Sequence, residues 1–496
     1  MEKIQLLLRQ STTTVYHFGL FLLVLSLPFS NFLMSISQII LFGAWLLDGK
    51  IKEKIKKFLK NRTALVISSI FLLHLLGLIY TQDFVYGCED VRKKIPLFLL
   101  PLLFSTSATL SEKNFRCLLR LFVLSVLITS GICFVVLLGW TNKQIIIPQN
   151  ASIFISHIRF SLMICISVFL LAYFISREKK ILTKLFFGLL ILWFIAFLIM
   201  MQSATGIICM IVTLFVLLIY FILRIKNIVP KISLLLMLFV FLFCVVKVFL
   251  YPLKTNTTIS ENGYYTWTNV CEKELAEEWN NRSKLNFYTK DLRGNDIKYT
   301  LIRFLTSKGL NKNAKGISAL SDEEINAIEK GIANVNYMGI FNPKARVMEI
   351  IWEFNIYLQG GNPSGHSVVQ RIELWKASIG IIKENFFFGV GTGDVEDAFS
   401  EQYKKINSPL TKEFHLRSHN QFLAIGTAFG LFGIIWFLLT LFYPLFVKKK
   451  WMDYFYITFF IIAILSMFTE DTLETQAGVT FFAFFNCLFL FARKEN

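Results

Sequence analysis

Residues 181–224 read ILTKLFFGLLILWFIAFLIMMQSATGIICMIVTLFVLLIYFILR, and this stretch decides the fold class. It holds two apolar runs of about 20 residues each, separated by a few polar residues around Gln202. A helix of that length crosses the hydrocarbon core of a bilayer, and the runs lack the alternating ten-residue pattern of a membrane β-barrel. The stretch therefore predicts an α-helical membrane protein.

Comparable apolar runs recur along the whole chain. Of its 496 residues, 55% are hydrophobic and 52 are phenylalanine, which is more apolar surface than a soluble protein of this size can bury. The predicted membrane spans are residues 14–28, 31–48, 63–80, 94–107, 115–139, 154–175, 181–201, 204–224, 231–251, 419–446, 453–469 and 475–492. We therefore predict an all-α integral membrane protein with about twelve transmembrane helices.

One long polar segment interrupts these runs. It divides the chain into residues 1–252 with helices 1–9, a large and mostly helical loop at residues 253–417, and residues 418–496 with helices 10–12. Within the loop, short amphipathic stretches at residues 322–332, 345–357 and 368–383 are predicted to be helical. The first part of the loop carries no motif that we can assign.

The distribution of charge orients the chain in the membrane. The net charge is +18, but residues 254–417 contain 21 Lys and Arg against 20 Asp and Glu, so the excess lies in the short loops. Basic short loops stay on the cytoplasmic side, and residues 50–62 are the clearest example. This predicts that both termini are cytoplasmic and that the long loop lies on the opposite face. The charge is explained by orientation, so we predict no nucleic acid partner.

Most of the eight cysteines lie in apolar runs, where they act as small core residues. Cys88 and Cys271 both fall in segments predicted to lie outside the membrane. A disulfide between them is open, because spacing alone does not establish proximity.

Ionisable residues in or beside membrane spans are costly and are therefore candidates for function. The candidates are His157 and Arg159 in the sixth span, Lys247 in the ninth, Arg417 and His419 at the start of the tenth, and Glu470 and Asp471 after the eleventh. All of them are predicted at one leaflet. The alternative is that the long side chains extend along the helix ends toward the headgroups, which is the more ordinary explanation for Lys247.

These residue types suit chemistry on a lipid-linked phosphate. A guanidinium group binds phosphate oxygens through two parallel hydrogen bonds and stays charged at any working pH. A histidine, with a pKa near neutrality, can take a proton from a hydroxyl group as a general base. Together they indicate group transfer from a lipid-linked diphosphate to a hydroxyl acceptor. For an isolated histidine at the start of a helix, capping or surface exposure is the ordinary alternative.

Two further features have plain structural interpretations. Gly389-Val390-Gly391-Thr392-Gly393 is similar to a phosphate-binding loop but lacks a βαβ context, so a turn before a helix is the main interpretation and a backbone anion site the alternative. The acidic residues that follow it, beginning with Asp394, read as a solvated turn. No histidine or cysteine spacing supports a metal site.

Four motifs together resemble the O-antigen ligase and polymerase superfamily. They are Arg371-Ile-Glu-Leu-Trp375, Gly389-Val-Gly-Thr-Gly393, Ser418-His419-Asn420-Gln421-Phe422-Leu423 and Gly430-Leu-Phe-Gly433, with ten residues between His419 and Gly430. Ser156–Arg159 and Thr469–Asp471 also lie where members of that superfamily have polar residues. The first motif departs from the ligase pattern, because Leu374 follows Arg371 by three positions and Trp375 occupies the fourth.

The resemblance implies a GT-C-like glycosyltransferase of the bacterial inner membrane that needs neither metal nor cofactor. It implies a glycan donor on undecaprenyl diphosphate, transfer with inversion at the periplasmic face, and lipid A-core as the acceptor of a ligase. By the same resemblance, His419 activates the acceptor hydroxyl, and Arg371 and Arg159 bind the diphosphate and stabilise it as the leaving group. Arg417 and Arg346 are further candidates for binding the diphosphate.

Other functions stay open at this point. A polymerase of the same superfamily uses a second glycan repeat as acceptor, and related enzymes use protein hydroxyls. A transporter or flippase predicts charged or broken helices near the bilayer midplane and two similar halves. Here the ionisable residues gather at one leaflet and the halves differ, which favours an enzyme.

Overall fold

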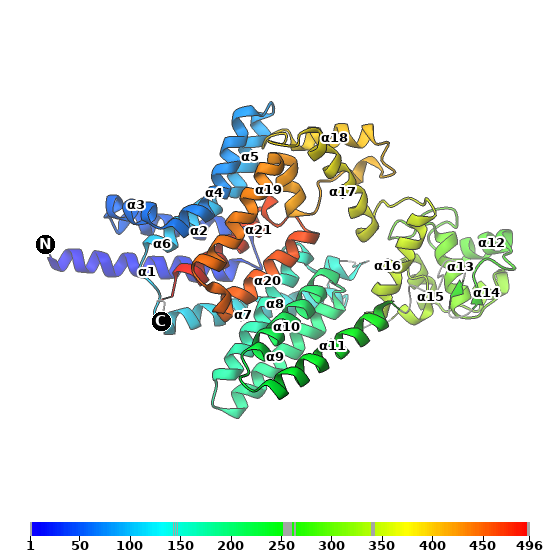
Figure 1. The fold of residues 1–496 in the computed structure, drawn as a ribbon. Coiled ribbons are helices and arrows are strands. Elements are labelled where there is room, and N and C mark those ends of the chain that lie inside the picture. Colours follow the sequence, from blue (N-terminus) through cyan, green and yellow to red (C-terminus); the bar gives the residue numbers. More distant parts are fainter. Residues whose placement is uncertain are drawn as a thin grey trace.

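The chain folds into a large bundle of apolar helices with a smaller group of helices beside it (Figure 1). The structure is a computed structural model that describes residues 2–141, 143, 145, 147–250, 260–261, 264–338 and 343–493. Within helices, the side chains of residues 2–10, 241–242, 244–246, 248–250 and 343–346 lie outside this description.

The bundle contains every apolar run that the sequence predicts as a span. Its helices are α1 (Glu2–Ser26), α2 (Asn31–Leu47), α3 (Ile51–Lys60), α4 (Arg62–Gly77), α5 (Phe84–Lys94), α6 (Pro96–Thr106), α7 (Glu112–Leu137), α8 (His157–Arg177), α9 (Ile181–Met200), α10 (Ala204–Leu223), α11 (Ile228–Leu250), α19 (Gln421–Val447), α20 (Tyr454–Thr469) and α21 (Gln476–Phe491). Each of the twelve predicted ranges overlaps one of these helices, and α3 and α5 are additional. The predicted all-α architecture is confirmed.

Not all of these helices are long enough to cross a bilayer alone. Among the described residues, α7, α8, α9, α10, α19 and the segment Arg62–Tyr80 qualify by length and composition, and α2 with α3 adds a seventh if the pair, bent by 112°, is one span. The predicted span 94–107 is the 11-residue helix α6, about 16 Å long, against a hydrocarbon core of about 30 Å. The chain is a multi-pass membrane protein, and the count of twelve spans stays a prediction.

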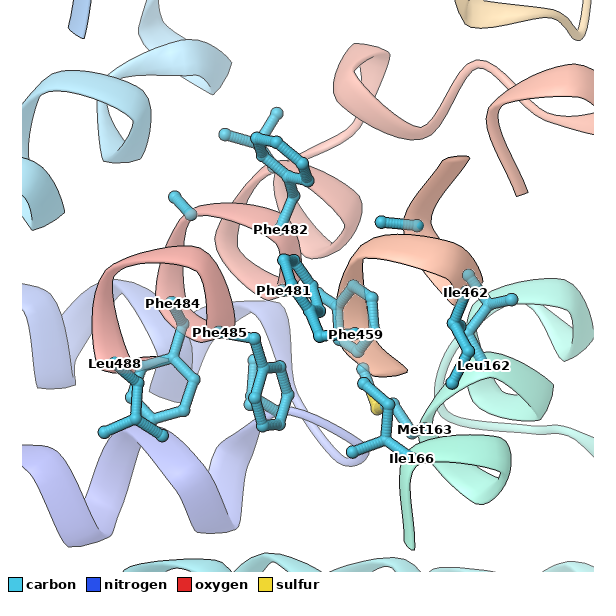
Figure 2. Close-up of a cluster of buried hydrophobic side chains, with 14 of the residues drawn as sticks. Leu162, Met163, Ile166, Phe459, Ile462, Phe481, Phe482, Phe484, Phe485 and Leu488 are labelled. Carbon is cyan, nitrogen blue, oxygen red and sulfur yellow. The ribbon is translucent and has the colours of Figure 1, made fainter. Parts of the chain in front are cut away.

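The core of the bundle joins α8, α20 and α21 (Figure 2). Phe459 of α20 packs against both Phe481 and Phe485 of α21, with ring centroids 6.2 and 6.0 Å away, and Leu162 and Met163 of α8 approach from the other side. Because rigid packing of this kind fixes helix ends as well as helix faces, it sets where the loop between α20 and α21 meets the start of α8.

The first part of the long polar loop builds a second, separate core, and its last part packs onto the core of the bundle. The elements of the loop are β1 (Ser260–Glu261), β2 (Tyr264–Tyr265), α12 (Glu272–Arg282), α13 (Ile297–Ser307), α14 (Ala314–Ser318), α15 (Asp322–Glu329), α16 (Pro343–Leu358), α17 (Ser367–Glu384) and α18 (Val395–Lys405). The three helices predicted in the loop are confirmed as α15, α16 and α17. The two short strands pair antiparallel. Trp279, Phe287, Phe304 and nine further apolar residues of α12–α15 and their loops are buried together with Ala276 in the second core.

A break in α19 connects the loop to the bundle. Gly430 has φ +61° and ψ −156°, a conformation that a residue with a side chain rarely adopts, and its Cβ would meet the backbone of Phe387 at 2.5 Å. The backbone N–H groups of Leu431 and Phe432 then donate to the carbonyls of Phe386 and Phe387. The segment after α17 therefore inserts into the break and ties α17 to α19.

The disulfide left open by the sequence is not formed in this structure. Cys88 and Cys271 are both exposed and both free.

Candidate active site

Three carboxylates lie in the connection between α20 and α21. Glu470 and Asp471 follow the last turn of α20, and Glu474 ends the 3-10 turn Thr472–Glu474 that leads into α21. Their side chains are only 7%, 9% and 8% exposed. A buried carboxylate is costly unless a positive charge or hydrogen bonds compensate it, and two clusters of partners do so here.

The first cluster surrounds Glu470 and Asp471. Nδ1 of His419 lies 3.6 Å from Oδ1 of Asp471 and 3.8 Å from Oε1 of Glu470. Arg159, in the first turn of α8, donates from Nη2 to the same Oε1 of Glu470 at 3.1 Å. Four of the predicted residues therefore meet in one site. Glu470 and Asp471 are adjacent in the sequence, and the other two lie more than 50 residues from them and from each other.

Arg371 contacts the residue that directly precedes the same connection. Its Nε donates to the carbonyl of Thr469 at 3.0 Å, and its Nη1 donates to the carbonyl of Ser367, one turn earlier in α17, at 2.7 Å. Because Thr469 directly precedes Glu470, the guanidinium group contributes positive charge beside that carboxylate, and it helps to lower the pKa of Glu470.

The Ser-His-Asn-Gln motif explains how His419 is held. His419 has φ +46°, in the left-handed region, so its neighbours must fix it. Oδ1 of Asn420 accepts from the N–H groups of Phe422 and Leu423 at the start of α19, and its Nδ2 donates to the carbonyl of Phe468. Oε1 of Gln421 accepts from the N–H of Leu473 at 2.6 Å. These two residues dock the start of α19 against the acidic connection.

Protonation in this cluster follows from its charges. Burial disfavours the imidazolium form of His419, but the nearby Asp471 and Glu470 more than offset it and raise its pKa to about 9. Burial also opposes ionisation of Glu470, but His419 and Arg159 outweigh it and hold the pKa of that carboxyl down at about 2. At neutral pH, the imidazolium of His419 and the guanidinium of Arg159 are therefore paired with the carboxylate of Glu470.

The second cluster surrounds Glu474. Its carboxylate accepts from Lys94 at 2.8 Å, from Arg417 at 3.0 Å and from Nε2 of Gln421 at 3.1 Å. Lys94 is fully buried and also bonds Asp90, one turn earlier in α5. Burial raises the pKa of Glu474, but the charges of Lys94 and Arg417 reverse this and hold it well below its usual range. The predicted diphosphate ligand Arg417 thus lies beside the first cluster and not within it.

Sequence reasoning missed the residues that complete the second cluster. Asp90 and Lys94 lie four residues apart at the end of α5, a spacing that does signal an ion pair. His74 of α4 lies 3.7 Å from Asp90 through Nδ1. Glu474 is close in sequence to the acids that were predicted. A cavity of about 10 Å³, about the size of one water molecule, lies between these groups and Ser418.

The glycine-rich turn has a packing role. The N–H groups of Val390 and Gly391 donate to the carbonyls of Thr427 and Ala428 in α19, so they are not directed toward a ligand. Gly389 has φ +67°, and a Cβ there would meet the backbone of Ala428 at 2.4 Å. Asp394 accepts from Thr81 and from two backbone N–H groups of the loop before α5. These contacts support the turn interpretation over an anion site or a metal site at these residues.

Three other predicted residues are not placed in the two clusters by the described contacts. His157 is the first residue of α8, two before Arg159. Lys247 is exposed on α11 and lies over the ring of Phe243, with Nζ 5.1 Å from the ring centroid. The side chain of Arg346 lies outside the described residues.

His419, Glu470 and Asp471 also form the one group in the described part of the chain whose donor atoms lie close enough to share a metal ion. Divalent ions are bound by donor sets of this kind, an imidazole nitrogen with two carboxylates. Arg159 already donates to Glu470, however, and a cation would compete with this guanidinium for the same oxygen. The prediction of a metal-independent site is therefore one to be tested.

Comparison with known proteins identifies the family of the chain. The family model described as O-antigen ligase matches residues 189–438, which include Arg371, His419 and the Gly430 break. No curated protein matches the chain.

Proposed function

The chain belongs to the O-antigen ligase family, and from that premise we propose that it is a glycosyltransferase acting on a lipid-linked glycan. The proposed donor is a glycan on undecaprenyl diphosphate, and the proposed acceptor is a hydroxyl group of lipid A-core. A polymerase, with a second glycan repeat as acceptor, and a protein O-oligosaccharyltransferase are the alternatives within the superfamily.

The observation that carries the proposal is the meeting of His419, Arg159 and Arg371 around the connection that begins with Glu470. Two guanidinium groups suit a diphosphate, because they neutralise the charge that develops on the leaving group. Nε of Arg159 is buried and has no hydrogen-bond partner in the described part of the chain, so this guanidinium has a donor that its bond to Glu470 does not use.

His419 suits the acceptor side of the reaction. With Nδ1 directed toward Asp471 and Glu470, the ring leaves Nε2 for a substrate hydroxyl, and its side chain is 30% exposed. In the proposed step the hydroxyl oxygen attacks the anomeric carbon while its proton passes to Nε2 of the neutral imidazole. The bond from the anomeric carbon to the diphosphate breaks on the opposite side, so that the configuration inverts. The electron pair leaves with the diphosphate, beside Arg159 and Arg371.

The placement of charge supports the proposed orientation in the membrane. The candidate site lies at the His157 end of α8, while Arg177 is the last residue of the helix and Lys179 and Lys180 follow it. Helix α6 begins two residues after Lys94. At its other end, the carbonyl of Thr106 accepts a hydrogen bond from Lys57 of the basic helix α3. Since basic segments mark the cytoplasmic face, we place residues 253–417 and the site at the periplasmic face of the inner membrane, with both termini in the cytoplasm.

Deletion of the gene tests the ligase assignment directly. A ligase mutant accumulates long lipid-linked polymer and leaves lipid A-core bare, because no other step joins the two. A polymerase mutant instead caps lipid A-core with single repeats. Single-repeat capping in the deletion strain would overturn the ligase assignment and favour the polymerase.

Purified protein separates the enzyme from a transporter or flippase. An enzyme forms glycosylated product in detergent from lipid-linked glycan and acceptor, without a membrane gradient. The wild-type protein and the variant His419→Ala should be compared in the same preparation. Equal product from both would refute the role of His419, and no product from either would count against the enzyme.

A further inference from the structure

A cleft of about 600 Å³ lies between the second core and the start of α17. One wall comes from α13 and the loop before it, and the opposite wall comes from α16 and the residues that precede α17. The volume lies within the range of about 300–1,000 Å³ that is usual for ligand sites. One wall of the cleft, formed by α13 and the loop before it, belongs to the part of the long loop for which the sequence offered no motif.

The cleft is built from ordered contacts. Nη1 of Arg293 pairs with Glu349 of α16 at 2.9 Å and joins the two walls. Arg303 of α13 lies over the ring of Trp352, 4.6 Å from its centroid, which joins them a second time. The carboxylate of Asp291 accepts from Thr300 and from two backbone N–H groups, so it fixes the loop that leads into α13. The two walls are therefore held at a defined separation.

The lining has a mixed chemistry. Four aromatic side chains, Tyr299, Tyr337, Trp352 and Phe414, face the cleft together with amides and hydroxyls such as Asn295, Asn362 and Ser364. Its charged residues nearly cancel: the basic ones are Lys290, Arg293 and Arg303, and the acidic ones are Asp296, Glu349, Glu353 and Glu413. A phosphate site would carry a positive excess, and an acyl-chain site would carry few polar groups. Neither description fits.

A carbohydrate chain does fit. The faces of aromatic rings are electron-rich and attract the weakly positive C–H groups on the flat side of a sugar ring. Carboxylates, amides and guanidinium groups together offer both acceptors and donors for its hydroxyl groups. Tyr299 is the most suitable platform, because it is 44% exposed while its ring packs edge-on against Trp267.

The cleft also leads toward the candidate active site. His366 lines the cleft, packs edge-on against Trp352 and is followed directly by α17. Arg371 lies five residues further along the chain, which is about 7 Å along the helix. A glycan in the cleft would therefore extend along α17 toward the cluster around His419.

We propose that this cleft binds the carbohydrate portion of a substrate several sugars away from the reacting bond. The proposal rests on the proposed glycosyltransferase function. It holds for the glycan of either the donor or the acceptor, because the recognising chemistry is the same. The lining does not distinguish the two sources, and the experiment does.

The test uses full-length protein in detergent and measures KM separately for lipid-linked donor and for lipid A-core acceptor. Tyr299→Ala should raise KM for one of the two by about three- to tenfold, as expected for one lost ring contact. Tyr299→Phe should restore it, because the ring is kept. Tyr288→Ala is the matched control, since Tyr288 is 69% exposed in the same group of helices and does not line the cleft. The substrate whose KM rises identifies the source of the glycan.

Unchanged KM values for both substrates in Tyr299→Ala would overturn the cleft proposal while the transferase function stands. If wild-type protein forms no product at all, the function fails, and direct binding then decides the cleft. The probe is the oligosaccharide released from the host lipopolysaccharide by mild acid, titrated by calorimetry against wild type and Tyr299→Ala. Equal binding to both, or no binding to wild type, overturns the proposal; weaker binding to the variant supports it.

Discussion

Nε of Arg371 donates a hydrogen bond to the backbone carbonyl of Thr469, at 3.0 Å, and so joins α17 to the end of α20 directly before Glu470. The contact uses a backbone atom, so it depends on the shape of the guanidinium group as well as on its charge. It connects the long loop to the membrane bundle at the point where the charged residues meet.

Replacement of Arg371 by lysine should impair transfer even though the charge is kept. A lysine ammonium has one nitrogen, so it cannot replace the two guanidinium nitrogens that bond Thr469 and Ser367. It also cannot bind a diphosphate through two parallel hydrogen bonds. We expect the rate of product formation to fall by at least about tenfold. The measurement is transfer by purified protein, with the exposed Lys383→Ala in the same helix as control. A rate of product formation in Arg371→Lys equal to that of the control would contradict a role that depends on the shape of the guanidinium group.

His419→Ala should abolish transfer and leave both protein level and donor binding largely intact. The side chain lies at the surface end of the cluster, and Asn420 and Gln421 keep the start of α19 docked without it. The check is single-turnover product formation alongside binding of the lipid-linked donor. Full activity in this variant would remove the general-base assignment.

The pH dependence of the reaction should reflect the raised pKa of His419. A general base must be neutral, so the rate should rise with pH, reach half its maximum at the pKa of about 9 and level off above it. Asp471→Asn removes one of the charges that raise this pKa and should move the rise to lower pH. A pH–rate profile of the two proteins provides the measurement, and identical profiles would contradict the assignment.

The raised pKa of His419 makes the stability of the fold change with pH in the opposite direction to the rate of transfer. Because the pKa of His419 in the folded protein lies above its ordinary value of 6.5, the stabilising contribution of the imidazolium is complete below about pH 6.5 and is lost as the pH rises through about 9. Thermal unfolding of wild type should therefore show a loss over this window that His419→Ala lacks. Activity and stability would change in opposite directions across the same pH range.

Glu474→Gln should destabilise the fold strongly. It would leave Lys94 buried with only Asp90 as a carboxylate partner and would remove the close partner of Arg417. Loss of one member of a buried ion pair costs about 3–5 kcal/mol. Thermal unfolding in detergent measures this, and the exposed Glu401→Gln is the control. A melting temperature equal to that of the control would mean that the network contributes little.

Chelation tests the metal-independent mechanism. If the charges of Arg159 and Arg371 stabilise the leaving group, transfer should be unchanged after treatment with EDTA and dialysis. Loss of activity that a divalent ion restores would instead assign His419, Glu470 and Asp471 as metal ligands.

The apolar helices and the chemistry-bearing residue types could be predicted from the sequence, because length and composition determine them locally. The runs around residues 181–224 are helices α9 and α10, and the amphipathic stretches of the loop are helices α15–α17. The family assignment from the motifs of Arg371 and His419 is confirmed.

The sequence alone could not show which distant residues lie close together in space. The neighbours of His419 in the chain are uncharged except Arg417, so nothing local indicates that two carboxylates raise its pKa. The ion pair of Lys94 with Glu474 joins residues 380 positions apart. The core around Trp279 was missed because its helices are short and polar, and their apolar faces are recognised only when they pack together.

Helices α20 and α21 are short for membrane spans, and this has a consequence for the connection between them. Each has 16 residues, or about 24 Å, against a hydrocarbon core of about 30 Å. Residues 477–490 of α21 are all buried, so neighbouring helices and not lipid surround this helix. Irregular backbone at membrane depth is tolerated only where protein or water surrounds it. The ion pairs of Arg159 with Glu470 and of Arg417 with Glu474 therefore also shield this irregular connection from the lipid.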